Sequence, residues 1–219
     1  MCSGSVGTMS EPLGGRRAEA ARNDVRVLRA AREVLTGDPD APMSDIARRA
    51  GVGVGTLYRR YAGREALVVA LCLDGVRALS AEAARALEQV DADPWGAFAG
   101  YMTGAYDAGA GALGASVMGS FTPTQELVDA SRQAADGLRD LLARAQAGGA
   151  VREDVTTEDV GLLFEQLRAV RLGDDRRSGE LQRRYLALVM QALRAPAAGP
   201  LPGPPPGWDE IRRRWTARG

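Results

Sequence analysis

The sequence predicts an all-α protein, and two observations carry that prediction. Outside the two ends of the chain, Ala, Leu, Arg, Glu and Val dominate, and most of these residue types lose little side-chain freedom in a helix. Apolar residues also recur at three- and four-residue spacing, whereas no segment alternates at period two for long enough to form a strand. With 219 residues, the chain can bury a sizeable core in one or two domains.

About nine helices are expected, separated by breaks that contain Gly or Pro. The first begins near residue 22, with Val27, Ala31 and Leu35 on one face, and Gly37 ends it. Pro42 suits the first turn of the second helix, because its missing N–H would have no partner there. The helices after the first are expected over residues 42–50, 54–61, 64–90, 94–108, 112–120, 124–147, 157–172 and 178–194.

The two ends of the chain lack this periodicity. Residues 1–21 are rich in Gly and Ser and are expected to form a mobile arm. Residues 196–219 are a Pro-rich tail, in which the segment APAAGPLPGPPPGW must be extended and buries little. The closing WDEIRRRW could form one or two turns docked by its tryptophans, or no structure at all.

Composition excludes several kinds of site. All 28 basic residues are Arg and there is no His, which rules out His-based triads, general bases and metal ligands. Cys2 and Cys72 are too few for a disulfide framework or a zinc site. The sequence has neither the pattern of a secretory signal nor an apolar run long enough to cross a membrane. We therefore expect a cytoplasmic protein with no metal, no cofactor, no membrane partner and no catalytic residues.

Charge is divided unevenly along the chain. Residues 1–64 carry 11 Arg against 7 Asp and Glu, and residues 65–219 carry 17 Arg against 21 Asp and Glu. A basic front part on an acidic body suits a protein that touches a polyanion with one end only, although a chance imbalance explains the numbers equally well.

The most informative segment is MSDIARRAGVGVGTLYRRYAGREAL, residues 43–67. Ile46 faces inward on the second helix, and the small Ala47 beside it lets two helices cross closely. Gly51 lies where that helix must end and the chain must reverse, which glycine does without steric cost. Leu57 returns to the same core, whereas Arg59 points elsewhere. This pattern predicts a helix-turn-helix, whose second helix has the size and polarity to enter a major groove.

Two other interpretations of this segment are weaker. GVGVG, residues 51–55, could suggest a dinucleotide-binding loop, but position 56 is Thr where a third Gly is needed, and no strand precedes it. The pairs Arg48/Arg49 and Arg59/Arg60, taken alone, are typical of a solvated helix face. Within a helix-turn-helix they favour contact with DNA.

At these residues the sequence resembles the tetracycline-repressor (TetR) family of transcription regulators. IARRAGVGVGTLYRRYAGREAL is similar to the family pattern IA-x-x-AGVS-x-G-TLYRHF-x-S-KEAL, and with the first helix the resemblance covers about residues 22–67. Residues 141–163 resemble the C-terminal domains of such regulators more weakly. The resemblance implies a helix-turn-helix DNA-binding domain over residues 22–66 and a helical ligand-binding and dimerisation domain over residues 67–195.

Several positions depart from the family pattern. Gly53 replaces Ser, and Gly63 replaces Ser or Thr, so two helix caps lack a side chain. Replacing such a cap by Gly lowers the stability of the helix by only about 0.3 kcal/mol. Tyr61 replaces Phe and keeps the ring. Met43 stands where many members have Thr or Val, and it offers no hydroxyl.

The resemblance also assigns DNA contacts. The third helix would be the recognition helix, Tyr58 matches the family's phosphate-contacting tyrosine, and Arg64 replaces the usual Lys at the start of a helix that faces a phosphate. The expected DNA-binding residues are Ser44, Val54, Gly55, Thr56, Tyr58, Arg59, Arg60 and Arg64.

Aromatic and Met residues recur at helical spacing in the second part of the chain. As a bare pattern they are more often core than a ligand site, but the resemblance implies a core hollowed out to hold an effector. The residues expected to line this largely apolar pocket are Phe98, Tyr101, Met102, Tyr106, Met118, Phe121 and Phe164.

Apolar stripes also mark the last two long helices. Ordinary packing within one chain would explain them, but the resemblance implies that these helices pair with their mates in a four-helix interface of a homodimer, which a two-fold operator requires. The residues expected in this interface are Val160, Leu163, Leu167, Tyr185, Leu188, Val189 and Ala192.

The implied function is transcription regulation, as a repressor that leaves double-stranded operator DNA when a small apolar or amphipathic effector binds. An activator of the same fold is an alternative that the sequence does not separate from a repressor. The alternative from another class is an all-α enzyme or an interaction bundle, for which Glu165 with Asp107 or Glu126 would be the best, though poor, acid–base candidates.

Overall fold

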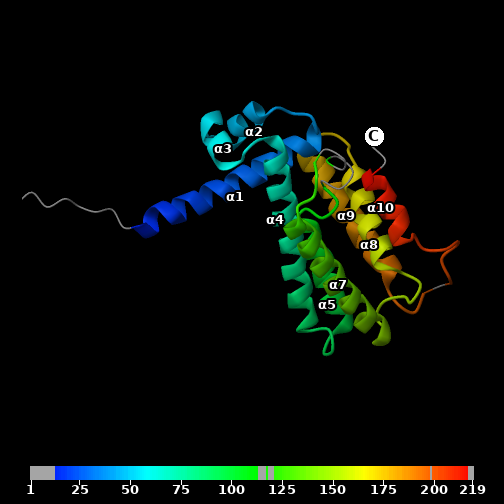
Figure 1. The fold of residues 1–219 in the computed structure, drawn as a ribbon. Coiled ribbons are helices and arrows are strands. Elements are labelled where there is room, and N and C mark those ends of the chain that lie inside the picture. Colours follow the sequence, from blue (N-terminus) through cyan, green and yellow to red (C-terminus); the bar gives the residue numbers. More distant parts are fainter. Residues whose placement is uncertain (1–12, 113–116, 118–120, 198, 217–219) are drawn as a thin grey trace, which may run out of the picture.

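The computed structural model describes residues 13–112, 117, 121–197 and 199–216 and is all-helical in these residues, as predicted (Figure 1). Apart from one isolated β-bridge between Val151 and Arg194, they contain no β-structure. The helices are α1 (Leu13–Gly37), α2 (Met43–Ala50), α3 (Val54–Arg60), α4 (Arg64–Leu87), α5 (Pro94–Asp107), α7 (Gln125–Ala147), α8 (Thr157–Ala169), α9 (Asp175–Leu193) and α10 (Trp208–Thr216).

Several helix boundaries differ from the sequence-based expectation. α1 begins at Leu13, so residues 13–21, expected in a mobile arm, are helical, because the Ala, Glu and Arg residues there have high helix propensity. α9 begins before residue 178, because the Asp174 side chain accepts a hydrogen bond from the Arg177 N–H at 2.7 Å and caps the helix. The tail, left open above, ends in helix α10. The helix expected over residues 112–120 lies largely outside the described residues.

Side-chain caps fix where the helices of the C-terminal part begin. The Asp93 carboxylate accepts a hydrogen bond from the Gly96 N–H at 2.8 Å, and Pro94 occupies the first turn of α5. α8 begins with a capping box, in which the Thr156 hydroxyl accepts from the Asp159 N–H and the Asp159 carboxylate accepts from the Thr156 N–H.

Two hydrophobic clusters divide the molecule. The N-terminal core joins α1, α2 and α3 to the first turns of α4, and its fully buried side chains include Leu35, Ile46 and Leu57. The C-terminal core joins the second half of α4 to α5, α7, α8 and α9 around Phe98 and Met102. Burying these apolar side chains is the main stabilising contribution in each part.

Helix α4 belongs to both cores. Leu67, Val68 and Leu71 are buried in the N-terminal core, and Ala83 and Ala86 are buried in the C-terminal core. The boundary expected after residue 66 therefore falls inside the N-terminal core. A helix of 24 residues is about 36 Å long, so α4 is one continuous rod between the two parts.

Figure 1 shows how this rod arranges the molecule. α2 and α3 lie at one end of α4, and α1 projects from that end to one side. α5 and α7 run along α4, and α8 and α9 form the far side, with α10 against them. None of the described helices is both long enough and apolar enough to cross a lipid bilayer.

Candidate nucleic-acid interface and regulatory core

The turn between α2 and α3 has the geometry that the sequence predicts. Gly51 adopts a left-handed conformation, with φ 67° and ψ 35°. Its N–H donates to the Arg48 carbonyl at 3.2 Å, and the Val52 N–H donates to the Ala47 carbonyl at 3.0 Å. This bonding satisfies the carbonyls at the end of α2 and reverses the chain, and only glycine adopts it at little cost.

Helix α3 is held by one apolar anchor and is otherwise open. Leu57 is buried in the N-terminal core, whereas Val54, Thr56 and Tyr58 are exposed. No side chain caps the helix at Gly53, whose carbonyl instead accepts hydrogen bonds from the Thr56 and Leu57 N–H groups. The first turn of α3 thus presents backbone and small side chains to the outside, which lets a groove approach closely.

The arginines around this turn differ in whether their charge is already paired. Arg48 pairs with Asp45 at 3.0 Å, Arg49 pairs with Glu33, and Arg60 pairs with Asp24 of α1. Arg59 forms no ion pair with any of the described residues, and its guanidinium donates to the Thr56 hydroxyl at 2.9 Å. Arg59 is therefore the arginine of α3 whose charge is available to an outside anion.

Two other predicted contact residues differ from each other in exposure. Ser44, in the first turn of α2, is exposed. Arg64, at the start of α4, is half-buried and donates to the Pro39 carbonyl in the loop between α1 and α2. Arg64 therefore has a structural contact that its place in the sequence pattern does not reveal.

Tyr61 closes α3 on the inner side. Its ring packs against the N-terminal core, and burial, followed by the nearby Asp24 carboxylate, raises the pKa of its hydroxyl. The Tyr61 ring therefore packs against the core at the position where the family pattern has Phe.

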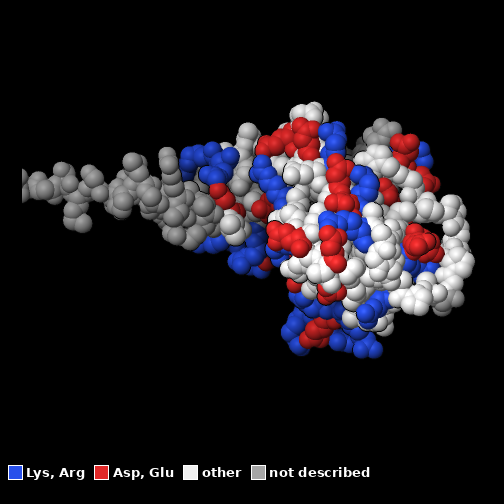
Figure 2. Space-filling view, turned by 90° about the horizontal axis from the view of Figure 1, so that it is seen from below, with Lys and Arg blue, Asp and Glu red and all other residues white. Residues whose placement is uncertain are grey.

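On the face seen in Figure 2, positive charge is not gathered into one large patch. Figure 2 shows Arg side chains interspersed with Asp and Glu over the face seen there. Among the described residues, several Arg side chains form local pairs within one helix, such as Arg139 with Asp136 and Arg132 with Asp129. Exposed pairs of this kind contribute little to stability and leave little net charge to attract a polyanion.

The C-terminal core brings together most of the residues expected around an effector. Phe98, Tyr101, Met102, Tyr106 and Phe164 are all buried in this one cluster. Burial raises the pKa of the Tyr101 hydroxyl, which stays protonated. In this conformation the five side chains pack together as part of the C-terminal core.

Two residues of the expected pocket are not in that cluster. Phe121 packs against the N-terminal core instead of the C-terminal one, together with Val117 of the same segment. Met118 lies outside the described residues.

Tyr106 is also held by polar groups that the sequence pattern did not indicate. Its hydroxyl donates to the Gln182 side-chain oxygen at 2.8 Å, and Gln182 is buried. The Arg168 guanidinium lies 4.0 Å from the centre of the Tyr106 ring and donates to the Tyr106 and Ala110 carbonyls. Desolvation lowers the pKa of Arg168. Through its two carbonyl contacts and its ring contact, Arg168 caps the end of α5.

A junction connects the two cores, and no sequence motif marks it. Arg32 of α1 pairs with Asp74 of α4 at 3.1 Å. The Thr122 N–H donates to the Glu65 carboxylate at 2.8 Å, which joins the segment before α7 to the start of α4. Val117 of the same segment is buried in the N-terminal core. These contacts hold the segment after α5 against the N-terminal core and the start of α4.

The outer face of α8 and α9 holds only some of the residues expected in a dimer interface. Val160 and Leu167 are buried in the C-terminal core of the same chain, so they do not form a free surface. In this structure the buried side of α8 thus packs within its own chain. Leu163 and Val189 are partly buried against that core.

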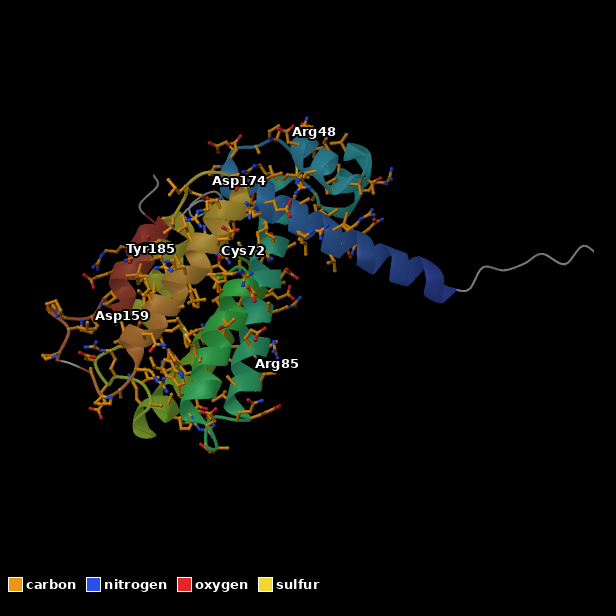
Figure 3. All side chains as sticks on the ribbon, turned by 180° about the vertical axis from the view of Figure 1, so that it is seen from behind. Arg48, Cys72, Arg85, Asp159, Asp174 and Tyr185 are labelled. Carbon is orange, nitrogen blue, oxygen red and sulfur yellow. The ribbon has the colours of Figure 1, made fainter. Side chains whose placement is uncertain are left out.

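The remaining three residues of the expected interface form an open stripe. Tyr185, Leu188 and Ala192 are exposed along α9, and Figure 3 labels Tyr185 there. Since they recur at three- and four-residue spacing, they lie on one face of the helix.

Two of the acid–base candidates of the alternative function, Asp107 and Glu126, form ion pairs. Asp107 pairs with Arg183 at 2.9 Å, and Glu126 pairs with Arg77 at 2.6 Å. Burial raises the pKa of the Cys72 thiol to about 11, which disfavours the thiolate form at neutral pH.

Two family models match the chain. The model described as bacterial regulatory proteins, tetR family, matches residues 27–71, which hold the helix-turn-helix. The model described as transcriptional regulator SbtR-like, C-terminal domain, matches residues 93–195. A comparison with functionally curated proteins found no match.

Solved structures of regulators resemble the chain over most of its length. A TetR transcription regulatory protein from Mycobacterium vanbaalenii is 31% identical, with 82% of this chain and 99% of that one covered and a TM-score of 0.51. The TetR regulator SCO0520 from Streptomyces coelicolor is 29% identical, with 80% and 99% covered and a TM-score of 0.53. LfrR from Mycobacterium smegmatis, solved in complex with proflavine, shares the fold at 22% identity, with 83% and 99% covered and a TM-score of 0.60.

These matches agree with the helix-turn-helix geometry and the all-helical body described above. The chain belongs to the TetR family of transcriptional regulators.

Proposed function

We propose that this regulator is a repressor, which occupies operator DNA as a homodimer and leaves it when a small apolar or amphipathic molecule binds the C-terminal core. The observation that carries the proposal is the open first turn of α3, mounted on the buried Leu57. The DNA-binding unit would be residues 22–66 together with the first turns of α4, and the regulatory unit would be the rest up to residue 195.

The first turn of α3 would enter the major groove. Val54, Gly55 and Thr56 are small enough to let the helix backbone approach the bases, and Arg59 would make the bidentate contact to a guanine. Tyr58, Ser44 and Arg64 would contact phosphates on either side. Arg60 would contribute less, because Asp24 already neutralises its charge.

Specific binding would require two copies. A helix-turn-helix reads a short half-site, and dimers of such domains place two recognition helices about one DNA turn, roughly 34 Å, apart. A two-fold interface uses the same surface of both subunits. The exposed side chains of Tyr185, Leu188 and Ala192 on α9 are the apolar surface of this chain that suits such an interface.

An effector would act by separating side chains that are packed together without it. LfrR, which has the same fold, was solved with the small molecule proflavine. In this chain the cluster of Phe98, Tyr101, Met102 and Tyr106 offers apolar surface with few polar groups, which favours an apolar or amphipathic ligand. Such a ligand regulates only through a difference in affinity between the packed and opened conformations.

The junction would transmit this change. Because α4 is buried in both cores, an opened C-terminal core would tilt it, and the Thr122–Glu65 contact would move with it. A tilt of α4 in both subunits changes the distance between the two recognition helices, which the spacing of operator half-sites does not tolerate.

The test is selection of DNA by the full-length protein from a random duplex library, followed by fluorescence anisotropy. The selected sequence should contain two related half-sites. The protein should also bind random duplex weakly, with an affinity that falls steeply as salt rises. Failure to enrich any sequence, together with salt-independent binding, would refute a role in reading DNA.

The effector is tested with the selected duplex and a library of neutral, amphipathic and highly charged small molecules. Apolar or amphipathic molecules should release the protein from DNA. Release by highly charged molecules alone would show that the packed cluster is not the effector site.

A further inference from the structure

A C-terminal strap, residues 199–211, crosses the outer face of α8 and α9. The matched family domain ends at residue 195, so the strap is an addition of this chain to that domain. Figure 1 shows the strap leaving the end of α9 and returning as α10 beside α8. The strap had no role in the proposed DNA contacts or effector site.

The strap is tethered at its beginning. The Arg152 side chain, which is largely buried, forms a two-point pair with Asp154 at 2.6 and 2.8 Å and also donates to the Gly199 carbonyl at 2.8 Å. The Asp154 carboxylate accepts a hydrogen bond from the Leu201 N–H at 2.8 Å. This two-residue staple holds the strap to the loop between α7 and α8.

Beyond the staple, the strap forms one wall of a groove and does not fill it. The groove has a volume of about 580 Å³. α8 contributes Leu162 and Leu163, α9 contributes Val189, and the strap contributes Leu201, Pro206 and Ile211. Most of these side chains are apolar, so an empty groove leaves favourable contacts unmade.

Apolar side chains next to the groove are uncovered as well. On the strap, Leu201 is 45% exposed and Trp208 is 59% exposed. On α9, Leu188 is 55% exposed and directly precedes Val189 of the groove wall. Large apolar side chains that are exposed beside an apolar groove favour an interaction site.

We propose that a second copy of this chain occupies the groove, so that the strap of each subunit contacts the other subunit of the dimer. This inference rests on the homodimer proposed above. The argument is self-complementarity: the ridge of Tyr185 and Leu188 and the groove next to it lie on the same face of α9. A two-fold axis brings the same patch of both subunits together, so the ridge of one subunit faces the groove of the other.

The experiment measures the dimer dissociation constant by sedimentation over a dilution series. It compares the full chain, a chain ending at residue 200, and the variant Ile211→Asp, which places a charge in the groove wall. Val128→Asp is the control, because Val128 is an exposed apolar residue of α7 that does not line the groove. Both strap changes should raise the dissociation constant at least tenfold, and the control should leave it within about twofold.

The outcomes separate this inference from the proposed function. A full chain that is monomeric at micromolar concentration refutes the homodimer, and with it the contact between the strap and the partner. A dimeric full chain whose dissociation constant is unchanged by both strap changes refutes the contact of the strap alone. A tighter dimer after truncation also overturns the inference, because the strap would then compete with the partner for α8 and α9. If truncation unfolds the protein, the dissociation constant of the Ile211→Asp variant alone tests the inference.

Discussion

Arg60 of α3 pairs with Asp24 of α1, while its neighbour Arg59 carries a charge that no described carboxylate neutralises. Two adjacent arginines of the helix that we propose reads DNA therefore differ in their contacts. Arg60 ties α3 to α1, whereas the charge of Arg59 remains available to an outside anion.

The first prediction compares these two arginines. Arg59→Ala should weaken operator binding by about 1–3 kcal/mol and relax the preference at one base pair in each half-site, because a bidentate contact to guanine is lost. Arg60→Ala should weaken binding less, and should lower the free energy of unfolding by at most about 1 kcal/mol, since the pair is partly exposed. Anisotropy with single-base operator variants measures the first effect, and urea unfolding the second. If Arg60→Ala relaxes the base preference and Arg59→Ala does not, the orientation of α3 in the groove is wrong.

Arg64 allows a second comparison. Arg64→Ala should weaken binding to all duplexes about equally and reduce the salt slope by about one per half-site, because a phosphate contact carries no sequence information. The melting temperature should also fall, because the Pro39 carbonyl loses its donor. Arg64→Lys should retain the salt slope but not the stability. A changed base preference in Arg64→Ala would place this residue inside the groove.

The dimer surface is tested by one exposed residue. Leu188→Asp should produce monomers and abolish specific operator binding, because one half-site supplies too few contacts. Leu163→Asp should do the same but also destabilise the fold, since Leu163 packs against the C-terminal core. Sedimentation and thermal unfolding of both variants separate the two effects. A dimeric Leu188→Asp protein with full affinity would move the interface elsewhere.

The structural features that could be predicted from the sequence are those that depend on residues close together in the chain. The turn at Gly51 and the anchor at Leu57 were predicted correctly, because both follow from residues within a few positions of each other. The surroundings of Val160 and Phe121 could not be predicted, for the opposite reason. A helical stripe shows that a residue is apolar, but it does not show which neighbour the stripe will face.

The polar contacts between distant segments could not be predicted from the sequence. Arg152 and Gly199 are joined across 47 positions, and Tyr106 and Gln182 across 76. No periodicity connects such residues, and Arg and Gln are so often exposed that their composition carries no signal. A Pro-rich tail was therefore expected to bury little, whereas the structure gives its first residues a specific tether.

Two glycines with similar backbone conformations give a matched prediction on stability. Gly111 and Gly149 have φ of 73° and 65°, so alanine at either position is strained by about 1 kcal/mol or more. A Cβ at Gly149 would meet open space, but at Gly111 it would lie 2.5 Å from the Phe164 backbone carbon. Gly111→Ala should therefore lose about 1–3 kcal/mol more in urea unfolding than Gly149→Ala. Equal losses would mean that the segment after α5 is not held against α8.

The last prediction concerns the staple of the strap. Hydrogen bonds from Arg152, and then from the Leu201 N–H, hold the pKa of the Asp154 carboxyl well below its usual range. Because the pKa is lowered in the folded protein, the contribution of Asp154 is fully present above its unfolded value of about 3.9 and is lost only as the pH falls through the lower folded value.

The strap should therefore stay attached between pH 7 and pH 5, with unchanged tryptophan emission, since Trp208 is on it. Asp154→Asn should loosen it at pH 7, because a neutral amide cannot replace the two-point pair with Arg152. Hydrogen exchange at pH 7 should become faster over residues 199–211 in this variant. Asp136→Asn is the control, because Asp136 pairs with Arg139 on the surface of α7 and does not touch the strap. Unchanged exchange in Asp154→Asn would show that the Pro-rich turn and α10, rather than the staple, hold the strap in place.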